Sequence, residues 1–371
     1  MKTNIGYGNL AYQDWAEEEE KYNPKYKSMK LLITGGAGFL GHHVVESILK
    51  NTDWDIVILD RLDVSGNLAR LIDMDIWEKE QHRVKFIWWD LKSQINEFIK
   101  RDIGKVDYIW HLAASSHVDR SIEDPMSFVM DNVVGTCNLL LYAKELKSLK
   151  QFTYFSTDEV FGPAPEGVNY QEDDRSNPGN PYAATKRGGE DLCVAFENTY
   201  KMPIIITHCM NIVGERQHPE KYIPMVIRKV LSGDTVTIHA NKDKTKAGSR
   251  FYIHARNVAD ALLFLTNKGV SGEKYNIVGE KEVDNLELAQ FIAKVVGNPL
   301  IFKMVSWHES RPGHDLRYSL DGEKMYQLGW TLPHNFEQSL TNTIKWYLKN
   351  PQWLNSLLKK EITNNYGNLD R

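Results

Sequence analysis

The fold is decided by the stretch Lys30-Leu-Leu-Ile-Thr-Gly-Gly-Ala-Gly-Phe-Leu-Gly41. Its first five residues form a short apolar run, which predicts a buried strand that ends at a glycine turn. Apolar residues then recur at helical spacing from residue 39 to residue 50. A glycine turn between a strand and a helix lets the backbone approach a pyrophosphate, which sits at the positive N-terminus of the helix. The stretch therefore predicts the first strand and helix of a dinucleotide-binding fold.

The same alternation of strand and helix continues outward from this stretch. Further strands are expected at residues 55–60, 84–88, 106–112, 152–156 and 204–208, and helices at residues 125–147 and 181–201. The helix at 125–147 starts at Asp124-Pro125, with Asp as the N-cap and Pro in the first turn. Repeated strand–helix units with short connections predict an α/β fold with a Rossmann-type, doubly wound parallel sheet covered on both faces.

An acidic residue at the end of the second expected strand indicates the cofactor. Asp60 lies 22 residues after Gly38. A carboxylate at this place hydrogen-bonds the adenosine ribose hydroxyls and repels a 2′-phosphate, which favours NAD over NADP. Arg61, next to it, weakens this choice slightly because a cation could accommodate a phosphate.

The length of 371 residues suits two lobes. Residues 1–28 are polar, with a run of four glutamates, and are expected to form an N-terminal extension. Residues 29–205 are expected to form the NAD-binding Rossmann domain. Residues 206–371, where the pattern loosens, are expected to form a smaller mixed α/β substrate lobe, with some segments returning to the first domain. In this lobe, helical patterns occur at 224–231, 255–267 and 286–296, and an extended pattern occurs at 236–239.

Composition excludes several classes of function. The balance of 45 Lys plus Arg against 49 Asp plus Glu gives a net charge of −4, so no broad basic surface for nucleic acid is expected. No apolar stretch has the length of a membrane span, and no set of His, Cys and acidic residues has convincing metal-ligand spacing. Three cysteines, far apart in the sequence, argue against a disulfide framework and for a reducing compartment, which we expect to be the cytoplasm.

Two further motifs carry possible chemistry. Tyr182 and Lys186 are four residues apart on a predicted helix, where an ammonium group lowers the pKa of a neighbouring phenol and prepares it as a base. The segment Ser156-Thr-Asp-Glu-Val-Phe-Gly162 follows a predicted strand, at the edge of the sheet where ligands bind. Its two adjacent acids suit an elimination that needs one protonated acid and one ionised base. From the acids alone, a solvated turn or a helix cap remains an equal alternative.

Together these motifs resemble a known family. The glycine turn, His111-Leu-Ala-Ala-Ser-Ser-His-Val-Asp-Arg-Ser121, Ser156 to Gly162, Pro181-Tyr-Ala-Ala-Thr-Lys186 and Arg311-Pro-Gly-His-Asp-Leu-Arg-Tyr318 are similar to motifs of the dTDP-glucose 4,6-dehydratases. These enzymes are extended short-chain dehydrogenase/reductases that act on nucleotide sugars. The resemblance runs from about residue 29 to about residue 346, and the Thr-Asp-Glu element is the part that points to the dehydratases.

The resemblance implies a role for each matching residue. Tyr182 would take the proton of the sugar 4-hydroxyl as NAD receives the C4 hydride, Lys186 would tune Tyr182 and hold the nicotinamide ribose, and Thr157 would hydrogen-bond the 4-oxygen. Glu159 would remove the C5 proton and Asp158 would protonate the departing C6 hydroxyl, after which the hydride returns to C6. The expected cofactor-binding residues are Gly35, Gly38, Phe39, Leu40, Gly41, Asp60, Asp90, Leu91, Ala113, Asn132, Tyr182 and Lys186.

The resemblance also implies residues that bind the sugar nucleotide. These are Ser116, His117, Asn211, Lys221, His239, Arg250, Asn276, Arg311 and His314. Three departures from the family pattern surround the expected base pocket. They are His239 in place of a Tyr, a longer lysine-containing stretch at 241–249, and the frame Arg250-Phe-Tyr-Ile-His in place of an Arg-Asp-Trp type. They leave the nucleotide base open among dTDP, UDP, GDP and CDP, and the sugar open beyond glucose.

Two other readings remain at this point. A nucleotide-sugar 4-epimerase or decarboxylase of the same fold would keep Tyr182 and Lys186 but needs no Asp158-Glu159 pair. A binding protein without turnover has no physical need for all five catalytic residues. The resemblance further implies a homodimer, formed by the helices after Pro125 and Pro181. The apolar residues expected at its interface are Val129, Val133, Cys137, Leu140, Ala184, Leu192 and Phe196.

Overall fold

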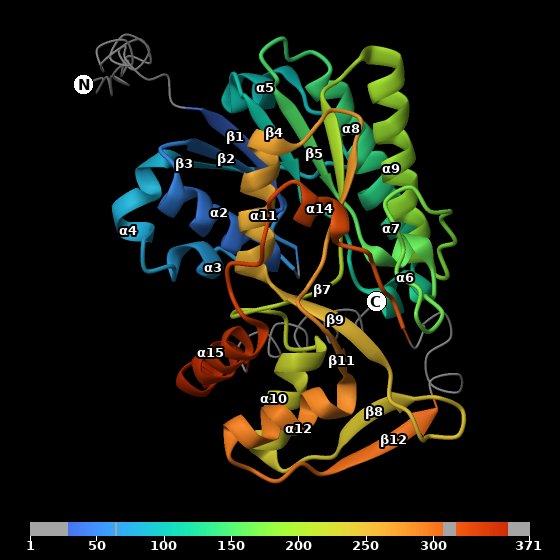
Figure 1. Ribbon diagram of the computed structural model, residues 1–371. Helices are drawn as coiled ribbons and strands as arrows, with labels where there is room; N and C mark the ends of the chain where they lie inside the picture. Colours follow the sequence, from blue (N-terminus) through green and yellow to red (C-terminus); the bar gives the residue numbers. More distant parts are fainter. Residues whose placement is uncertain (1–28, 64, 307–316, 355–371) are drawn as a thin grey trace, which may run out of the picture.

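The computed structural model describes residues 29–63, 65–306 and 317–354, so the predicted extension at 1–28 lies outside the described residues. Its main feature is a seven-stranded sheet in the order β10-β6-β5-β4-β1-β2-β3, in which every neighbouring pair is parallel. The strands are β1 (Lys30–Thr34), β2 (Asp55–Asp60), β3 (Val84–Trp88), β4 (Tyr108–His111), β5 (Gln151–Phe155), β6 (Ile204–Cys209) and β10 (Lys274–Ile277). This sheet lies above the second lobe in Figure 1.

Helices cover both faces of the sheet because its strands are apolar on both sides. Leu31 and Ile33 of β1 belong to one buried cluster, with side chains of α2 (Phe39–Asn51) and α11 (Ala255–Lys268). Leu32, between them, points to the opposite cluster, formed with α5 (Glu97–Ile103), α8 (Gly135–Ala143) and α9 (Pro181–Tyr200). Alternation of this kind follows from the two-residue period of a strand. The predicted α/β doubly wound fold is confirmed.

The segment expected to form one regular helix at residues 125–147 is not a single regular helix. It consists of α7 (Pro125–Val129), a π-helical turn at Met130–Val134 and α8, which ends at Ala143. Asp124 caps its start, with its carboxylate accepting the Ser127 N–H. A π turn places one extra residue in the helix and often occurs at functional sites. Apolar periodicity gives no signal for it, so the sequence predicted one regular helix.

The smaller lobe is built from short sheets and three packed helices. Its strands are β7 (Asn211–Val213), β8 (Val236–Ala240), β9 (Ser249–His254), β11 (Glu282–Asp284) and β12 (Phe302–Ser306). Its helices are α10 (Tyr222–Ser232), α12 (Asn285–Val296) and α15 (Phe336–Lys349), which enclose a separate apolar cluster. β9 pairs antiparallel with β11 and parallel with β7, whereas β8 pairs parallel with β12.

Two elements beyond residue 205 belong with the main sheet: one is a strand of it, and the other is a helix that packs on it. Strand β10 pairs with β6 and forms one edge of that sheet, and helix α11 packs against α2. The 255–267 pattern predicted a helix, which forms as α11, but it packs on the main sheet rather than within the smaller lobe. The remaining short helices are α3 (Ala69–Ile72), α4 (Trp77–Glu80), α6 (Val118–Glu123) and α14 (Glu323–Gln327), with 3₁₀ turns at Gln81–Arg83 and Asp158–Phe161.

Candidate active site

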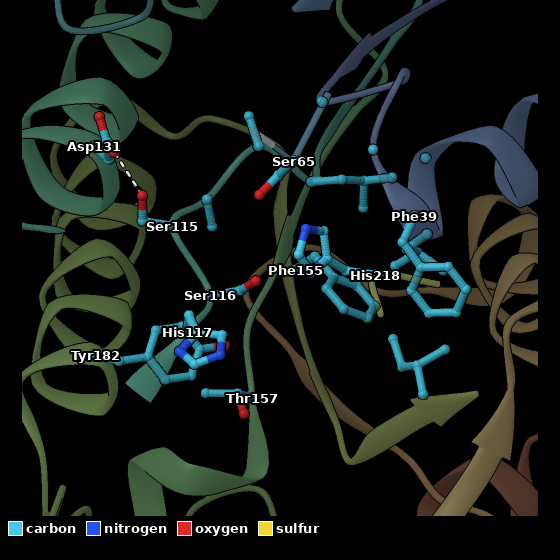
Figure 2. Close-up of a pocket in the computed structure, with 18 of the residues that line it drawn as sticks. Phe39, Ser65, Ser115, Ser116, His117, Asp131, Phe155, Thr157, Tyr182 and His218 are labelled. Carbon is cyan, nitrogen blue, oxygen red and sulfur yellow. Dashed lines mark hydrogen bonds between the residues drawn. The ribbon is translucent and has the colours of Figure 1, made fainter. Parts of the chain in front are cut away.

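A deep cleft lies at the carboxyl ends of the central strands and continues to the smaller lobe. Its walls come from the glycine turn after β1, the segments that follow β2, β4 and β5, the start of α9 and the residues from β7 to α10. Figure 2 shows Phe39 and His218 on one side of this cleft, and Tyr182, His117 and Thr157 on the other. Ligands of open α/β sheets bind at this edge.

The glycine turn leaves no room for side chains. Gly35 has a φ of +74°, and a Cβ there would lie 2.9 Å from the Ala113 backbone. A Cβ on Gly41 would lie 2.1 Å from the Gly35 carbonyl oxygen. Gly38 precedes α2 without a side-chain cap, so the first amides of α2 are free to bind an anion. The turn therefore fits a pyrophosphate, as the sequence predicted.

Asp60 lies beside this turn, at the end of β2. Its carboxylate is buried and accepts the Ala37 N–H at 3.0 Å and the Leu62 N–H at 2.9 Å. Burial raises the pKa of Asp60, and the two backbone amides oppose that rise. The side chain is thus fixed at the rim of the cleft, where a ribose hydroxyl can donate to it.

Arg61 is held by acidic side chains. Its guanidinium lies 2.5 Å from Asp131, 2.6 Å from Asp63 and 3.6 Å from Asp90. The hydrogen bond with Asp131 is the main reason why the pKa of Arg61 is raised, so the charge is permanent. Because these carboxylates already satisfy Arg61, it offers little to a 2′-phosphate, which would also meet their negative charge. This arrangement strengthens the preference for NAD.

The π turn supplies two of the contacts around this end of the cleft. Asp131 accepts the Ser115 hydroxyl at 2.6 Å, the bond drawn in Figure 2. Asn132, predicted to contact the cofactor, does not line the cleft and is 1% exposed. Its amide oxygen instead accepts the Ser115 N–H, and its amide nitrogen donates to the Ser115 carbonyl and to the Thr185 hydroxyl on α9. Asn132 therefore positions the segment that carries Ser116 and His117, and its contact with the cofactor stays a prediction.

The Thr157-Asp158-Glu159 element follows β5 and forms a 3₁₀ turn that Thr157 caps. The Thr157 hydroxyl donates to Asp158 Oδ1 at 3.0 Å, and Asn180 Nδ2 donates to Glu159 Oε2 at 2.9 Å. Burial raises the pKa of Asp158 to about 7, and the neighbouring Glu159 charge adds to that effect. Asp158 is therefore protonated over much of the neutral range. The two acids are buried or half-buried in the cleft wall rather than in a solvated turn.

Tyr182 and Lys186 line the same cleft from the first turns of α9, where Asn180 caps the helix. Burial raises the pKa of Tyr182, and the Glu159 charge adds to the rise, while a hydrogen bond with Thr157 opposes it. In the protein alone the pKa of Tyr182 is therefore raised, and its lowering by Lys186 stays a prediction. Lys186 Nζ donates to the Phe155 carbonyl at 2.6 Å, and burial lowers its pKa to about 8.

Charged side chains line the end of the cleft where the substrate is expected to bind. Glu220 lies 3.3 Å from His117 Nε2 and 3.0 Å from the Arg120 guanidinium. Lys221 Nζ donates to the Ser116 carbonyl at 3.3 Å. Burial, together with the Lys221 charge, lowers the pKa of His117, so its ring is neutral at neutral pH. Cations and amide donors at this end suit a diphosphate.

The predicted substrate residues divide into three groups. Ser116, His117, Asn211 and Lys221 line the cleft. His239, Arg250 and Asn276 do not line it: Arg250 stacks on the Tyr318 ring, and Asn276 is fully buried, with its amide bound to the Tyr170 and Asp321 carbonyls. The Asn276 amide nitrogen thus binds two backbone oxygens, and contact of Asn276 with the substrate stays a prediction. Arg311 and His314 lie outside the described residues.

The predicted cofactor residues gather in one place, with the exception of Asn132. Gly35, Gly38, Phe39, Leu40, Gly41, Asp60, Asp90, Leu91, Ala113, Tyr182 and Lys186 all line the cleft. Sequence reasoning missed others that do so, notably Asp131, Ser115, His218 and Glu220. Asp131 and Glu220 are each adjacent in sequence to a predicted site residue, Asn132 and Lys221. An acidic residue next to a predicted site residue was therefore a signal that could have found them. No such signal pointed to His218.

Comparison with known proteins agrees with this geometry. The model of the NAD dependent epimerase/dehydratase family matches residues 31–278. The chain belongs to this family. The predicted cofactor, NAD, is confirmed by the family's own description, and the glycine turn and Asp60 fit it.

Within the family, dehydratases are more similar to this chain than epimerases. The dTDP-glucose 4,6-dehydratase of Escherichia coli is 35% identical over 355 residues, which cover 88% of this chain and 95% of that protein. The crystal structure of the dTDP-glucose 4,6-dehydratase DesIV of Streptomyces venezuelae, with NAD bound, is 34% identical with a TM-score of 0.81 and covers 89% of this chain and 100% of that one. The UDP-glucose 4-epimerase of Thermus thermophilus is 25% identical with a TM-score of 0.77, covering 86% and 99%.

Two features are absent from the described residues. None of the helices there combines the length and the apolar character that crossing a membrane requires. Among the same residues, His, Cys, Asp and Glu form no group of three or more that could hold a metal ion.

Proposed function

We propose that this family member is a nucleotide-sugar 4,6-dehydratase, which converts an NDP-glucose-type sugar to an NDP-4-keto-6-deoxy sugar and water. The observation that carries the proposal is a pair of adjacent acids, Asp158 and Glu159, in one cleft with Tyr182 and Lys186. A 4-epimerase needs the tyrosine and the lysine, but it breaks no C–O bond at C6. It therefore has no use for a second acid–base pair.

The first half of the reaction uses Tyr182, Lys186 and Thr157. The glycine turn and Asp60 would hold NAD, whose oxidised nicotinamide would supply the acceptor for the C4 hydride and whose reduced form would supply the hydride for C6. Tyr182 accepts the proton of the 4-hydroxyl as a phenolate, a form that the positive charges of Lys186 and bound NAD would favour, and Thr157 hydrogen-bonds the 4-oxygen beside it. Lys186 is anchored on the Phe155 carbonyl and keeps a positive charge near this exchange.

The second half uses the acids in different protonation states. The 4-ketone acidifies the C5 hydrogen, which Glu159 removes as a base while Asn180 holds its carboxylate in place. Asp158 is protonated because burial raises its pKa to about 7, so it can deliver a proton to the C6 hydroxyl as it leaves as water. Two carboxyl groups with separated pKa values are the usual basis for such a division of roles.

The substrate test is a panel of dTDP-, UDP-, GDP- and CDP-glucose. The expected product is a 4-keto-6-deoxy sugar, which gives a characteristic absorbance in alkali. Because similar proteins are named dTDP-glucose 4,6-dehydratases, dTDP-glucose is the first candidate substrate. Formation of an NDP-galactose without any keto product would replace the dehydratase proposal with the epimerase.

The proposal includes a homodimer in the cytoplasm. Met126, Val129, Val194 and Tyr200, on α7 and α9, are large apolar side chains exposed to solvent. Leu140 and Phe196, expected at the interface, are instead buried in the cluster under the sheet, so the dimer contact would use the first set. The three cysteines are free thiols, which suits a reducing compartment.

A further inference from the structure

A buried carboxylate below the active site has no part in the chemistry described so far. Glu190 lies on α9, one helical turn after Lys186, and is 0% exposed. A buried acid is costly unless its charge is paired and its oxygens are hydrogen-bonded. The partners of Glu190 therefore indicate what it holds in place.

Its first partner connects α9 to the catalytic strand end. The Ser156 hydroxyl donates to Glu190 Oε1. Ser156 directly precedes Thr157, Asp158 and Glu159, and its own amide donates to the Thr207 carbonyl of β6 at 2.7 Å. Glu190 thus ties the segment that carries the acids to the helix that carries Tyr182 and Lys186.

Its second partner is His208 on β6, whose Nε2 lies 3.2 Å from Glu190 Oε1. The other ring nitrogen, Nδ1, lies 3.1 Å from Asn276 Oδ1. Because the Asn276 amide nitrogen donates to two backbone carbonyls, its oxygen is fixed as an acceptor and His208 Nδ1 must carry a proton. The ring nitrogen Nε2 faces the Glu190 carboxylate. Asn276 thus sets the orientation of the His208 ring.

Glu190 also lies four residues from Lys186 on the same face of α9, so the charge of its carboxylate acts on the ammonium group. Around the ammonium group are Tyr154 of β5, with its ring 4.4 Å from Nζ, the neutral His111 of β4, and Cys193 on the same helix. Burial lowers the pKa of Lys186, and the Glu190 charge is the strongest influence that opposes it. Burial alone would raise the pKa of Glu190, but His208, Ser156 and Arg187 outweigh it and keep the carboxylate ionised.

We propose that Glu190 is a positioning residue of the dehydratase, which fastens the Thr157–Glu159 segment to α9 through Ser156 and supplies the buried counter-charge of the Lys186 ammonium group. This proposal rests on the proposed function for the roles of the residues that Glu190 positions. Its electrostatic half concerns Lys186 alone and requires no turnover.

The electrostatic half is tested by labelling Lys186 with acetic anhydride over a range of pH, without substrate, and measuring the acetylated peptide by mass spectrometry. Only the uncharged amine reacts, so the midpoint reports the pKa of Lys186. In Glu190→Gln the midpoint should fall by about one pH unit or more, because an opposite charge has been removed. Glu190→Asp should restore it. Asp191→Asn, which removes an exposed acid from the next position, should leave it unchanged. An unchanged midpoint in Glu190→Gln overturns this half.

The mechanical half is tested by Ser156→Ala, which removes one hydroxyl and keeps the buried charge. We expect kcat to fall about ten- to a hundredfold with KM little changed, because the acids lose their alignment with Tyr182. The Lys186 midpoint should stay at the wild-type value. If Ser156→Ala has the kcat of the wild type, the proposed connection through Ser156 is wrong. Because this substitution removes only one hydroxyl, the test remains possible even if Glu190→Gln does not fold. If the wild type turns over no sugar nucleotide, the proposed function fails, while the labelling comparison still decides the role of Glu190.

Discussion

Asp158 and Glu159 are neighbours in sequence, yet the structure gives them different surroundings. Asp158 is 5% exposed and accepts the Thr157 hydroxyl, whereas Glu159 is half-buried and oriented by Asn180. Residue types and spacing were enough to predict that both acids lie at the strand end. Their division into acid and base depends on burial, which a local pattern of residues does not reveal.

The first prediction separates oxidation from elimination. Glu159→Gln and Asp158→Asn should each slow product formation by about 10² to 10⁴, the usual effect of losing one positioned acid or base. Both variants should still oxidise C4, and Tyr182→Phe should suppress both steps. Single-turnover measurements with deuterium at C5 test this. Wild-type exchange of the C5 hydrogen in Glu159→Gln would show that Glu159 is not the base.

The second prediction concerns pH. Because the pKa of Asp158 is raised to about 7, its proton is present below that pH and lost above it. Loss of water from C6 should therefore slow about tenfold per unit as the pH rises well above 7. This alkaline limb should be missing from the slower Asp158→Asn variant. A wild-type elimination rate that stays constant from pH 6 to pH 9 would contradict the assignment.

The proton on Asp158 also affects the free energy of unfolding, so its presence can be tested without substrate. Between about pH 4 and pH 7 the folded protein keeps a proton on Asp158 that the unfolded chain has released, so this group's contribution to stability falls as pH rises through that window. Denaturant unfolding of Asp158→Asn and wild type at pH 5 and pH 8 should show the variant gaining relative stability at the higher pH. An equal difference at both values would count against a buried, protonated Asp158.

At the scale of elements, the expected strands of the first domain and its helices α2 and α9 followed from apolar periodicity and capping residues, whereas the shorter helices α3 to α6 were not predicted. The π turn at Met130–Val134 was not predicted either, because its apolar residues still fit a helical period. That turn decides the roles of Asp131 and Asn132, one facing the cleft and the other clamping Ser115. The strand β10 was also missed, since its four residues follow a region without regular alternation.

The third prediction concerns the glycine turn. In Gly41→Ala the new methyl group would lie 2.1 Å from the Gly35 carbonyl, so the turn must move and NAD binding should be lost. Gly233→Ala is the control. Its φ of +73° makes a side chain unfavourable by about 1 kcal/mol, but it lies in open space at the end of α10. Equilibrium dialysis with NAD should therefore find normal binding in the control. Normal binding in Gly41→Ala would contradict the proposed approach of the pyrophosphate.

At the scale of the whole molecule, the sequence predicted two lobes, the first for NAD and the second for the sugar nucleotide. It did not separate the predicted residues of the second lobe that line the cleft from those that do not. Asn211 and Lys221 line the cleft because β7 and α10 follow β6 directly at the edge where ligands bind. Asn276, in a frame that resembles the family equally well, lies buried on the edge strand β10 and supports the fold through its hydrogen bonds. Its contact with the ligand stays a prediction.

The fourth prediction concerns the dimer. Light scattering of the wild type at micromolar concentration should give twice the chain mass, and Val129→Asp or Val194→Asp should shift it to the monomer, because a charge in an apolar interface is costly. Phe98→Asp, on α5, is the control. This residue is similarly apolar and 69% exposed, and its change should leave the mass unaltered. A wild-type monomer would contradict the dimer.

The edge strand β10 has a consequence for how the protein can be made. The chain leaves the main sheet after Cys209 and returns to it only at Lys274–Ile277. A ribosome must therefore synthesise β7, α10, β8 and β9 of the smaller lobe before the sheet that binds the nucleotide can be completed. Until then β6 is an open edge, with unpaired amides and carbonyls that another chain can join. The first 209 residues, which end with β6, should accordingly not be obtainable as a well-behaved separate fragment, and nascent chains should need protection from aggregation until residue 277 has emerged.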